Sequence, residues 1–192
     1  MYQYKYPIVL ASASPRRKQL LEWADIPFTV DVANTDEQIP TNTRITDIPI
    51  IIASEKAIAV QQKHPHQTII IAADTIVEVK GKILGKPADS AEALQMLKSL
   101  NGQTHTVITG VCILSPDETI RFSTSTEVIF NELCVDELSY YIDRYKPYDK
   151  AGSYAIQEWI GAVGIQKING DFFNVMGLPI HEVYAALKKF IL

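Results

Sequence analysis

The chain has 192 residues, of which 47% are hydrophobic and 21% are charged, and its formal net charge is -4. This length predicts a single domain, residues 1–192, with enough chain to bury its own core. The composition excludes a disordered protein. The mild acidity argues against nucleic acid as a partner, because phosphate binding over a surface needs a basic face. A small phosphate ligand, which needs only a few local cations, is still compatible with this charge.

Cysteine content and hydropathy bear on the cellular compartment. Cys112 and Cys134 are too few for a disulfide framework and lie in apolar stretches, so we expect buried free thiols. The longest purely apolar run, 69–73, is far shorter than a membrane span. The apolar run at 8–11 is too short for the core of a signal peptide. We therefore expect a soluble, cytoplasmic protein with no membrane partner.

The N-terminal third of the chain predicts strands and helices in alternation. Residues 7–11 indicate a buried strand, and Ser14-Pro15 indicates the N-cap and first residue of a helix that ends near residue 24. Residues 28–32 alternate like a short strand, and the polar stretch 34–46 is typical of a loop. Asp47 is expected to cap a second helix that reaches about residue 63.

The middle of the chain is rich in β-branched residues. A strand over 68–73 is expected to end at Asp74, and a further strand to reach residue 79, before a hairpin turn at Lys80-Gly81. Asp89 and Glu92 have the spacing of a capping box, which predicts that a helix begins there.

The rest of the chain predicts two long alternating strands, 104–114 and 119–130, joined by a turn. The later elements are expected to be a helix over 135–145, strands over 162–168 and 172–175, and a closing helix over 179–190. The fold class is therefore mixed α/β with long antiparallel strands, rather than a regular βαβ array.

The sharpest chemical signal lies in residues 12–17, Ser-Ala-Ser-Pro-Arg-Arg, where a strand passes two hydroxyls and enters a helix. A helix N-terminus presents unpaired N–H groups and suits an anion. Arg16 and Arg17 oppose the helix dipole there, so their presence favours a bound anion, and guanidinium groups suit phosphate. The alternative is an ordinary serine cap followed by solvated arginines.

Asp74 gives the second signal, as an acid expected at the end of a buried strand, where clefts open in α/β folds. Such a carboxylate can ligate a divalent metal or act as a general base on water. The alternative is an aspartate that caps the following turn.

Three weaker signals have simple alternatives. The segment 81–87 is not a P-loop, because its glycines are too close and Pro87 stands where a serine or threonine is required. Lys86 can still reach a phosphate, or be a solvated loop lysine. Lys56 lies off the apolar stripe of its helix, so exposure is its default. Gln157 can read a base edge with its amide, or be a surface glutamine.

Together these segments resemble the Maf family of nucleoside triphosphate pyrophosphatases over nearly the whole chain. The resemblance rests on seven stretches that occur in order, at 10–17, 54–57, 73–77, 85–87, 100–105, 149–152 and 168–170. It implies an elongated, two-lobed fold around a central cleft, similar to ITPase, and a homodimer. It also implies hydrolysis of dTTP and UTP to the monophosphate and pyrophosphate, with modified pyrimidine nucleotides as further candidate substrates. The implied role is house-cleaning of nucleotide pools.

The resemblance further implies roles for individual residues. The catalytic acid falls on Asp74, and the positions that set substrate specificity fall on Arg16, Thr75 and Gln157. A divalent cation, Mg²⁺ or Mn²⁺, is implied as cofactor, held by Asp74 and by an acid at Asp36 or Glu37, of which we prefer Glu37. The side chains expected to bind phosphate or substrate are Ser12, Ser14, Arg17, Lys56, Lys86 and Lys150.

The alternative to an enzyme is a nucleotide-binding regulator linked to cell division and septum formation. A pure binder would keep the cations but could dispense with Asp74, so the presence of this acid favours the enzyme.

Overall fold

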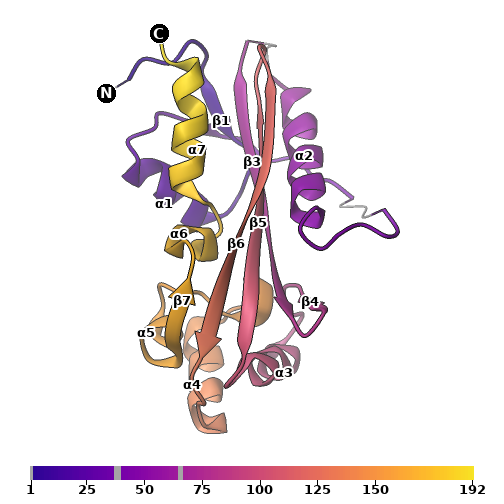
Figure 1. Cartoon of the computed structure of the whole chain (residues 1–192), viewed down its shortest axis with the longest axis vertical. Coiled ribbons are helices and arrows are strands. Elements are labelled where there is room, and N and C mark those ends of the chain that lie inside the picture. The colour runs from indigo at the N-terminus through magenta and orange to yellow at the C-terminus, as the bar shows by residue number, and fades with distance from the viewer. Residues whose placement is uncertain (1, 37–39, 65–66) are drawn as a thin grey trace. The chain divides into compact units, whose positions relative to one another are not determined.

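The computed structural model describes residues 2–36, 40–64 and 67–192 and confirms the mixed α/β class (Figure 1). The chain forms two compact units. Unit 1 comprises Met1–Asp74, Thr109–Thr124 and Gly177–Leu192, and unit 2 comprises Thr75–Ile108 and Ser125–Met176. Among the described residues, no helix is both long and apolar enough to cross a membrane.

The strands pair in the order β2-β1-β3-β5-β6-β7, and β4 pairs with β3. β1 is parallel to both neighbours, since Leu10 is in register with Val30 of β2 and with Ile71 of β3. β4 is antiparallel to β3, and β7 to β6. The strands are β1 (Ile8–Leu10), β2 (Thr29–Val30), β3 (Ile69–Val79), β4 (Lys82–Leu84), β5 (Thr104–Leu114), β6 (Thr119–Phe130) and β7 (Ile165–Asn169).

Unit 1 places helices on both faces of its strands. In Figure 1, α2 (Ile48–Gln61) lies on one face, and α1 (Pro15–Trp23) and α7 (Ile180–Leu187), which η2 (Lys188–Phe190) follows, lie on the other. The core beneath α2 is made of small and β-branched side chains: Val9, Ala11, Ala53, Ala57, Val60, Ile70, Ala72 and Cys112. The helix approaches β5 closely, because a Cβ on Gly110 would lie 2.3 Å from the backbone of Pro49 and Ile50.

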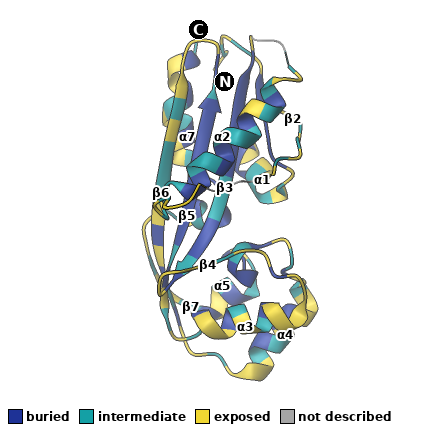
Figure 2. Ribbon diagram, turned by 90° about the vertical axis from the view of Figure 1, so that its right-hand side faces the viewer, coloured by how far each residue is buried: buried dark blue, intermediate teal, exposed yellow. Residues whose placement is uncertain are grey.

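Unit 2 contains α3 (Ser90–Leu100), α4 (Val135–Tyr145), η1 (Ala151–Ser153), α5 (Trp159–Gly164) and α6 (Phe172–Met176). The predicted cap of α3 is present, since Asp89 Oδ1 accepts the Glu92 N–H at 2.9 Å. Its buried face is Ala93, Leu97 and Leu100. The outward faces of α3 and α4 are exposed (Figure 2).

Three elements whose hydrophobic pattern repeats regularly have the predicted bounds. β5, β6 and α4 begin and end at the predicted residues. The hairpin at Lys80-Gly81 is confirmed as well, with both residues at positive φ, 51° and 79°, as a tight turn between right-handed twisted strands requires.

Two of the predicted strands are wrong. Residues 172–175 form helix α6, because the Asp171 carboxylate accepts the Phe173 N–H at 2.8 Å and so caps a helical first turn. The predicted strand 162–168 is in part helix α5, and only Ile165–Asn169 is extended. Short apolar runs of this kind do not distinguish a strand from a buried helix.

Three local expectations are also corrected. Cys112 is buried as expected, but Cys134 is exposed, because it lies just before α4 at the surface. Ser14 and Asp47 precede their helices, yet neither side chain makes a capping hydrogen bond. The Asp47 carboxylate instead accepts a hydrogen bond from Arg44 Nε at 2.7 Å.

Candidate functional site

The loop after β1 is organised around the Ser12 hydroxyl. Ala11 N–H donates to Ile71 O at 2.8 Å and extends the pairing of β1 with β3 by one residue. Ser12 is then buried, and its Oγ accepts the Ser14 N–H at 3.2 Å and Arg17 Nη1 at 3.2 Å. This hydroxyl therefore fixes the turn into α1 and orients the first arginine-bearing turn of the helix.

Arg17 is held by the backbone of a distant segment. Its Nε donates to Gly177 O at 2.7 Å, and Gly177 has a φ of 112°, which side chains rarely adopt. Burial lowers the pKa of the Arg17 guanidinium, the Asp74 carboxylate acts in the opposite direction, and the like charge of Arg16 adds to the lowering. Arg17 is thus not the solvated arginine of the simple alternative. Gly177 is not among the residues predicted for the site, although a glycine close before Pro179 is a signal for this turn.

Lys56 on α2 and Asp74 on β3 form an ion pair, with Nζ 2.7 Å from Oδ1. Their side chains are 20% and 18% exposed, so both charges are largely withdrawn from water while each still reaches it. The default of a solvent-exposed Lys56 is therefore wrong: the helix directs this side chain at Asp74.

The expectation that Asp74 ends a strand is also wrong. β3 continues without interruption through Val79, because Thr75, Ile76 and Val77 favour an extended backbone and the first turn residues are Lys80-Gly81. The pairing of β3 with β1, however, ends at Ile71. Asp74 therefore lies beyond the carboxyl end of β1, which is where ligand-binding groups gather in parallel α/β sheets.

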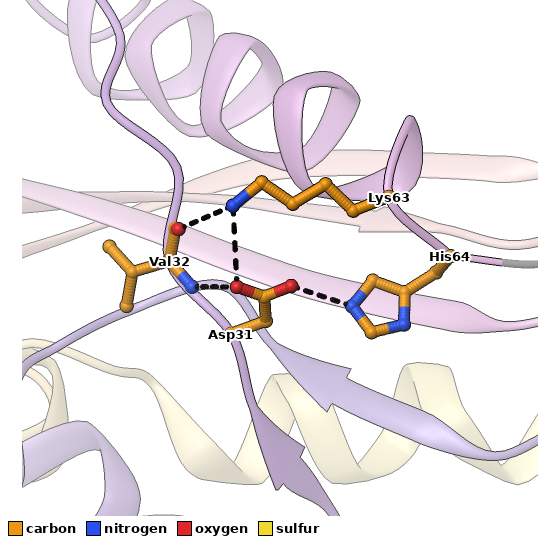
Figure 3. A network of polar contacts seen from close by, with 4 residues as sticks. All are labelled: Asp31, Val32, Lys63 and His64. Atoms are coloured by element: carbon orange, nitrogen blue, oxygen red, sulfur yellow. Dashed lines mark hydrogen bonds and ion pairs between the residues drawn. The ribbon is translucent and has the colours of Figure 1, made fainter.

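The far end of α2 is anchored by a polar network that connects it to the chain after β2 (Figure 3). Lys63 Nζ donates to Val32 O at 2.8 Å and lies 3.4 Å from Asp31 Oδ1, and His64 Nε2 lies 2.9 Å from Asp31 Oδ2. The hydrogen bond with His64, above all, lowers the pKa of Asp31. With Gly110 against its first turn, α2 is restrained at both ends, which fixes the direction of Lys56 between them.

In unit 2, the segments that carry Lys86 and Lys150 are joined through a glycine. Gly152 N–H donates to Gly85 O at 3.0 Å, and Gly152 has a φ of 68°. A Cβ at this position would lie 3.0 Å from Val77 Cγ2 on β3. Glycine suits both the left-handed backbone and the close approach of this segment to β3. Lys86 itself is exposed.

Lys150 and Gln157 differ sharply in environment. The Lys150 side chain is 9% exposed, and its Nζ lies 2.7 Å from Asp149 Oδ1 and 3.5 Å from Glu158 Oε1. Gln157 is exposed on a turn. Thr75, half-buried, follows Asp74 directly in the chain and is the first residue of unit 2.

The predicted site residues therefore fall into two described groups. Unit 1 brings together Ser12, Arg17, Lys56 and Asp74, with Ser14 and Arg16 on the same turn; unit 2 holds Thr75, Lys86, Lys150 and Gln157. Asp36 is exposed in a loop, and Glu37 lies outside the described residues. In the part of the chain that the structure describes, no group of three His, Cys, Asp or Glu side chains is placed to hold a metal ion.

These features define an α/β protein with a charged site at the carboxyl end of a parallel strand, where helix N-terminus, guanidinium and ammonium groups suit an anionic ligand. The family model for Maf-like protein matches residues 7–190. The chain belongs to the Maf family.

Relatives of this family match along almost their whole length. A protein of Parabacteroides distasonis named dTTP/UTP pyrophosphatase is 49% identical over 97% of this chain and 97% of its own. Proteins of the same name from Porphyromonas gingivalis and Bacteroides fragilis are 50% and 47% identical, over 97% and 96% of this chain and 95% and 96% of theirs. A solved structure of the Staphylococcus aureus Ham1 protein aligns with 65% of this chain and 71% of its own, with 18% identity and a TM-score of 0.43.

Proposed function

We propose that this chain is a nucleoside triphosphate pyrophosphatase that hydrolyses dTTP and UTP to the monophosphate and pyrophosphate. The observation that supports this most directly is the Lys56–Asp74 ion pair beside the Ser12–Arg17 loop, at 2.7 Å between charged atoms. The names of the relatives supply the nucleotides. The same chemistry supports a house-cleaning role in nucleotide pools, and because these pools are cytoplasmic, the proposal places the enzyme there.

In the proposed reaction, water attacks the α-phosphorus, a new P–O bond forms, and the bridging oxygen between the α and β phosphates departs with pyrophosphate. A triphosphate carries several negative charges, so attack requires their neutralisation. Arg17, whose guanidinium is fixed by Ser12 and Gly177, offers a preorganised fork for phosphate oxygens. Lys56 contributes a second cation next to the acid.

Asp74 is assigned the proton of the attacking water. Lys56 binds Oδ1, and a carboxylate has a second oxygen, Oδ2, which we assign as the acceptor. A rigid strand and a restrained α2 keep this acid and its ammonium partner in one geometry, which general-base catalysis requires.

The donor set also fits the proposed divalent cation, Mg²⁺ or Mn²⁺, as an ion that shares the phosphate oxygens of the substrate. Mg²⁺ is usually held by one or two carboxylates together with substrate phosphates. Asp74 would supply one such carboxylate, because its two oxygens have about four lone-pair sites, of which Lys56 and the water proton use two. The ion would supply further charge neutralisation at the phosphates.

The exchange Asp74→Asn tests the proposal. We expect a folded protein whose rate of pyrophosphate release falls by about 10²–10⁴-fold, the usual contribution of a general base. The measurement is pyrophosphate release from dTTP, UTP, CTP and GTP, with and without Mg²⁺ or Mn²⁺.

Glu118→Gln is the matched control, because it also removes a carboxylate that pairs with a lysine of the same unit, with Glu118 Oε2 3.2 Å from Lys189 Nζ. It should keep wild-type turnover. A folded Asp74→Asn enzyme that turns over dTTP and UTP like the wild type contradicts the assignment, and a wild-type protein that releases no pyrophosphate from any nucleotide contradicts the proposed function as a whole.

A further inference from the structure

We propose that Tyr141 is a positioning residue for nucleotide selection, because its hydroxyl group holds the turn that presents Gln157. The inference rests on the proposed function and on the role in substrate specificity that the family resemblance implies for Gln157, whose amide can read the edge of a pyrimidine base. It concerns unit 2 alone, and it assigns a role to a buried hydroxyl on α4.

The turn itself comprises residues 155–158. Glu158 N–H donates to Ala155 O at 3.1 Å, which leaves Ile156 and Gln157 as the two central residues. Ile156 is buried under the turn, whereas Gln157 is exposed. The turn therefore fixes the backbone of Gln157 while its amide faces outward.

Both ends of this turn meet the same oxygen atom. The Ala155 N–H donates to Tyr141 Oη at 3.2 Å, and the Tyr141 hydroxyl donates a hydrogen bond to Glu158 Oε2. Tyr141 is 0% exposed, and its ring stacks on Tyr145 with centroids 5.0 Å apart. A fully buried phenol on a helix is a rigid support. The packing around its ring holds the ring in place, so the hydroxyl oxygen has a single position.

A second restraint acts on the turn from α5. A Cβ added to Gly161 would lie 1.7 Å from Ile156 O, so the helix packs backbone against backbone here. Gly161 N–H also donates to Glu158 O at 3.0 Å. The turn is thus confined by a helix backbone as well as by Tyr141, and the Tyr141 hydroxyl is the component that can be removed without disturbing the backbone.

Glu158 extends the effect to a second predicted substrate contact. One of its oxygens binds Tyr141, and the other lies 3.5 Å from Lys150 Nζ. A single hydroxyl group therefore supports the carboxylate that pairs with Lys150 and the turn that carries Gln157. Loss of that hydroxyl should affect how the base is recognised before it affects the chemistry of hydrolysis.

Tyr141→Phe tests the inference, because it removes one oxygen atom and keeps the ring. We expect the ratio of kcat/KM for UTP over GTP to fall about tenfold, the scale of one hydrogen bond to a charged group. In the Gln157→Ala background, the same exchange should cause no further change in this ratio, since the residue that it positions is absent.

Tyr145→Phe is the matched control, as it removes a hydroxyl from the neighbouring stacked ring of the same helix. It should leave the ratio unchanged. Amide hydrogen exchange gives a readout that does not depend on activity: the Ala155 and Glu158 amides should exchange faster in Tyr141→Phe and at the wild-type rate in Tyr145→Phe.

Two results overturn the inference: unchanged exchange at Ala155 and Glu158, or faster exchange with an unchanged UTP-to-GTP ratio. A uniform loss of kcat/KM for all nucleotides belongs to the second case. If Gln157→Ala alone leaves the ratio unchanged, the proposed role of Gln157 fails, and with it the functional part of the inference, whereas the exchange data still report whether Tyr141 holds the turn.

Discussion

Arg17 combines hydrogen bonds that hold the fold together with a proposed role in phosphate binding. An arginine in the first turn of a helix opposes the dipole, which alone predicts that its removal is neutral or slightly stabilising. The structure adds hydrogen bonds to Gly177 O at 2.7 Å and Ser12 Oγ at 3.2 Å. These contacts attach α1 to the segment before α7, so the sequence-based expectation for stability no longer holds for Arg17.

We expect Arg17→Ala to lower the free energy of unfolding by about 1–3 kcal/mol, the range for hydrogen bonds to charged groups. It should also reduce kcat/KM for dTTP by at least about tenfold, since a fixed guanidinium is lost from the phosphate site. Urea denaturation and pyrophosphate release measure the two effects. Unchanged stability with unchanged turnover contradicts both roles of Arg17.

Arg17→Lys separates the effect of the positive charge from the effect of the planar guanidinium group. Lysine keeps the positive charge, but it cannot donate from fixed planar N–H groups to both Gly177 and Ser12. The lysine variant should therefore recover part of the activity and little of the stability. Full recovery of both would mean that the charge alone suffices.

At the scale of elements, Gly152 controls whether the segment after Lys150 can pack against β3 and against the segment that carries Lys86. Gly152 has a φ of 68°, and its missing Cβ would lie 3.0 Å from Val77 Cγ2. Gly152→Ala therefore combines an unfavourable backbone conformation with overpacking on β3. We expect a loss of about 2–4 kcal/mol in the free energy of unfolding, as these two costs together suggest, and a higher KM because the Lys86 segment loses its neighbour.

Gly85→Ala is the control for this exchange, since a Cβ there meets nothing within 4 Å. Its stability should stay within about 0.5 kcal/mol of wild type. In Gly152→Ala/Val77→Ala the packing part of the loss should be relieved and the backbone part should persist. A Gly152→Ala variant as stable as Gly85→Ala is the contrary outcome.

Elements whose periodic pattern extends over many residues could be predicted from the sequence, whereas short elements could not. The alternation in 104–114 and 119–130 extends over enough residues to define both strands to their ends. The run Phe172–Met176 has too few residues to show a period, and its helical state depends on the Asp171 cap. The interruption expected at Asp74 does not occur, because one acidic residue does not end a strand that continues in β-branched residues.

The candidate site likewise has features that the sequence predicts and contacts that only the fold reveals. The types and order of residues predict that Ser12, Arg17 and Asp74 belong to an anion site. The Lys56–Asp74 pair depends on the packing of α2 against β3, and the contact of Arg17 with Gly177 O joins segments 160 residues apart. Neither contact has a local signature, so both required the fold.

At the scale of the whole molecule, a mildly acidic chain contains a locally cationic site. The net charge is -4, yet in unit 1 Lys56 pairs with Asp74, Arg17 is close enough to feel the Asp74 carboxylate, and Arg16 adds a like charge next to Arg17. Local geometry rather than net charge therefore decides which ligands suit the site. The effect of pH is expected on stability instead, through a buried histidine of unit 2.

His105 on β5 is a buried histidine from which a pH dependence of stability is expected. It is 2% exposed and lies among aromatic rings, with Nε2 2.7 Å from Tyr154 Oη and the Phe130 ring edge-on at 5.0 Å. No protein group pairs with its Nδ1 in the described structure. Burial lowers the pKa of His105 to about 4, so this imidazole is neutral in the folded protein at neutral pH.

The sign of the pH dependence follows from linkage. An unfolded histidine binds a proton below about pH 6.5, whereas folded His105 binds one only near pH 4. Between these values the unfolded state holds more protons, so the free energy of unfolding must fall as the pH falls. The contribution of His105 is constant above pH 6.5 and decreases by about 3 kcal/mol by pH 4, at 1.36 kcal/mol for each pKa unit.

We expect the double variant His105→Phe/Tyr154→Phe to lose this dependence, because it replaces both partners of the hydrogen bond with apolar rings of similar shape. Stability at pH 7 should change little, whereas at pH 4.5 the variant should be more stable than the wild type by about 2 kcal/mol. His105→Phe alone is the control for packing: it leaves the buried Tyr154 hydroxyl unpaired and should be destabilised at every pH.

Urea denaturation at pH 7, 5.5 and 4.5 gives the free energies of unfolding. In single-tryptophan variants, Trp23 of α1 reports on unit 1 and Trp159 of α5 reports on unit 2. Because β3, β5 and β6 each supply residues to both units, both tryptophans should report one transition that shifts with pH. An equally steep acid limb in the double variant and the wild type would show that His105 does not control it.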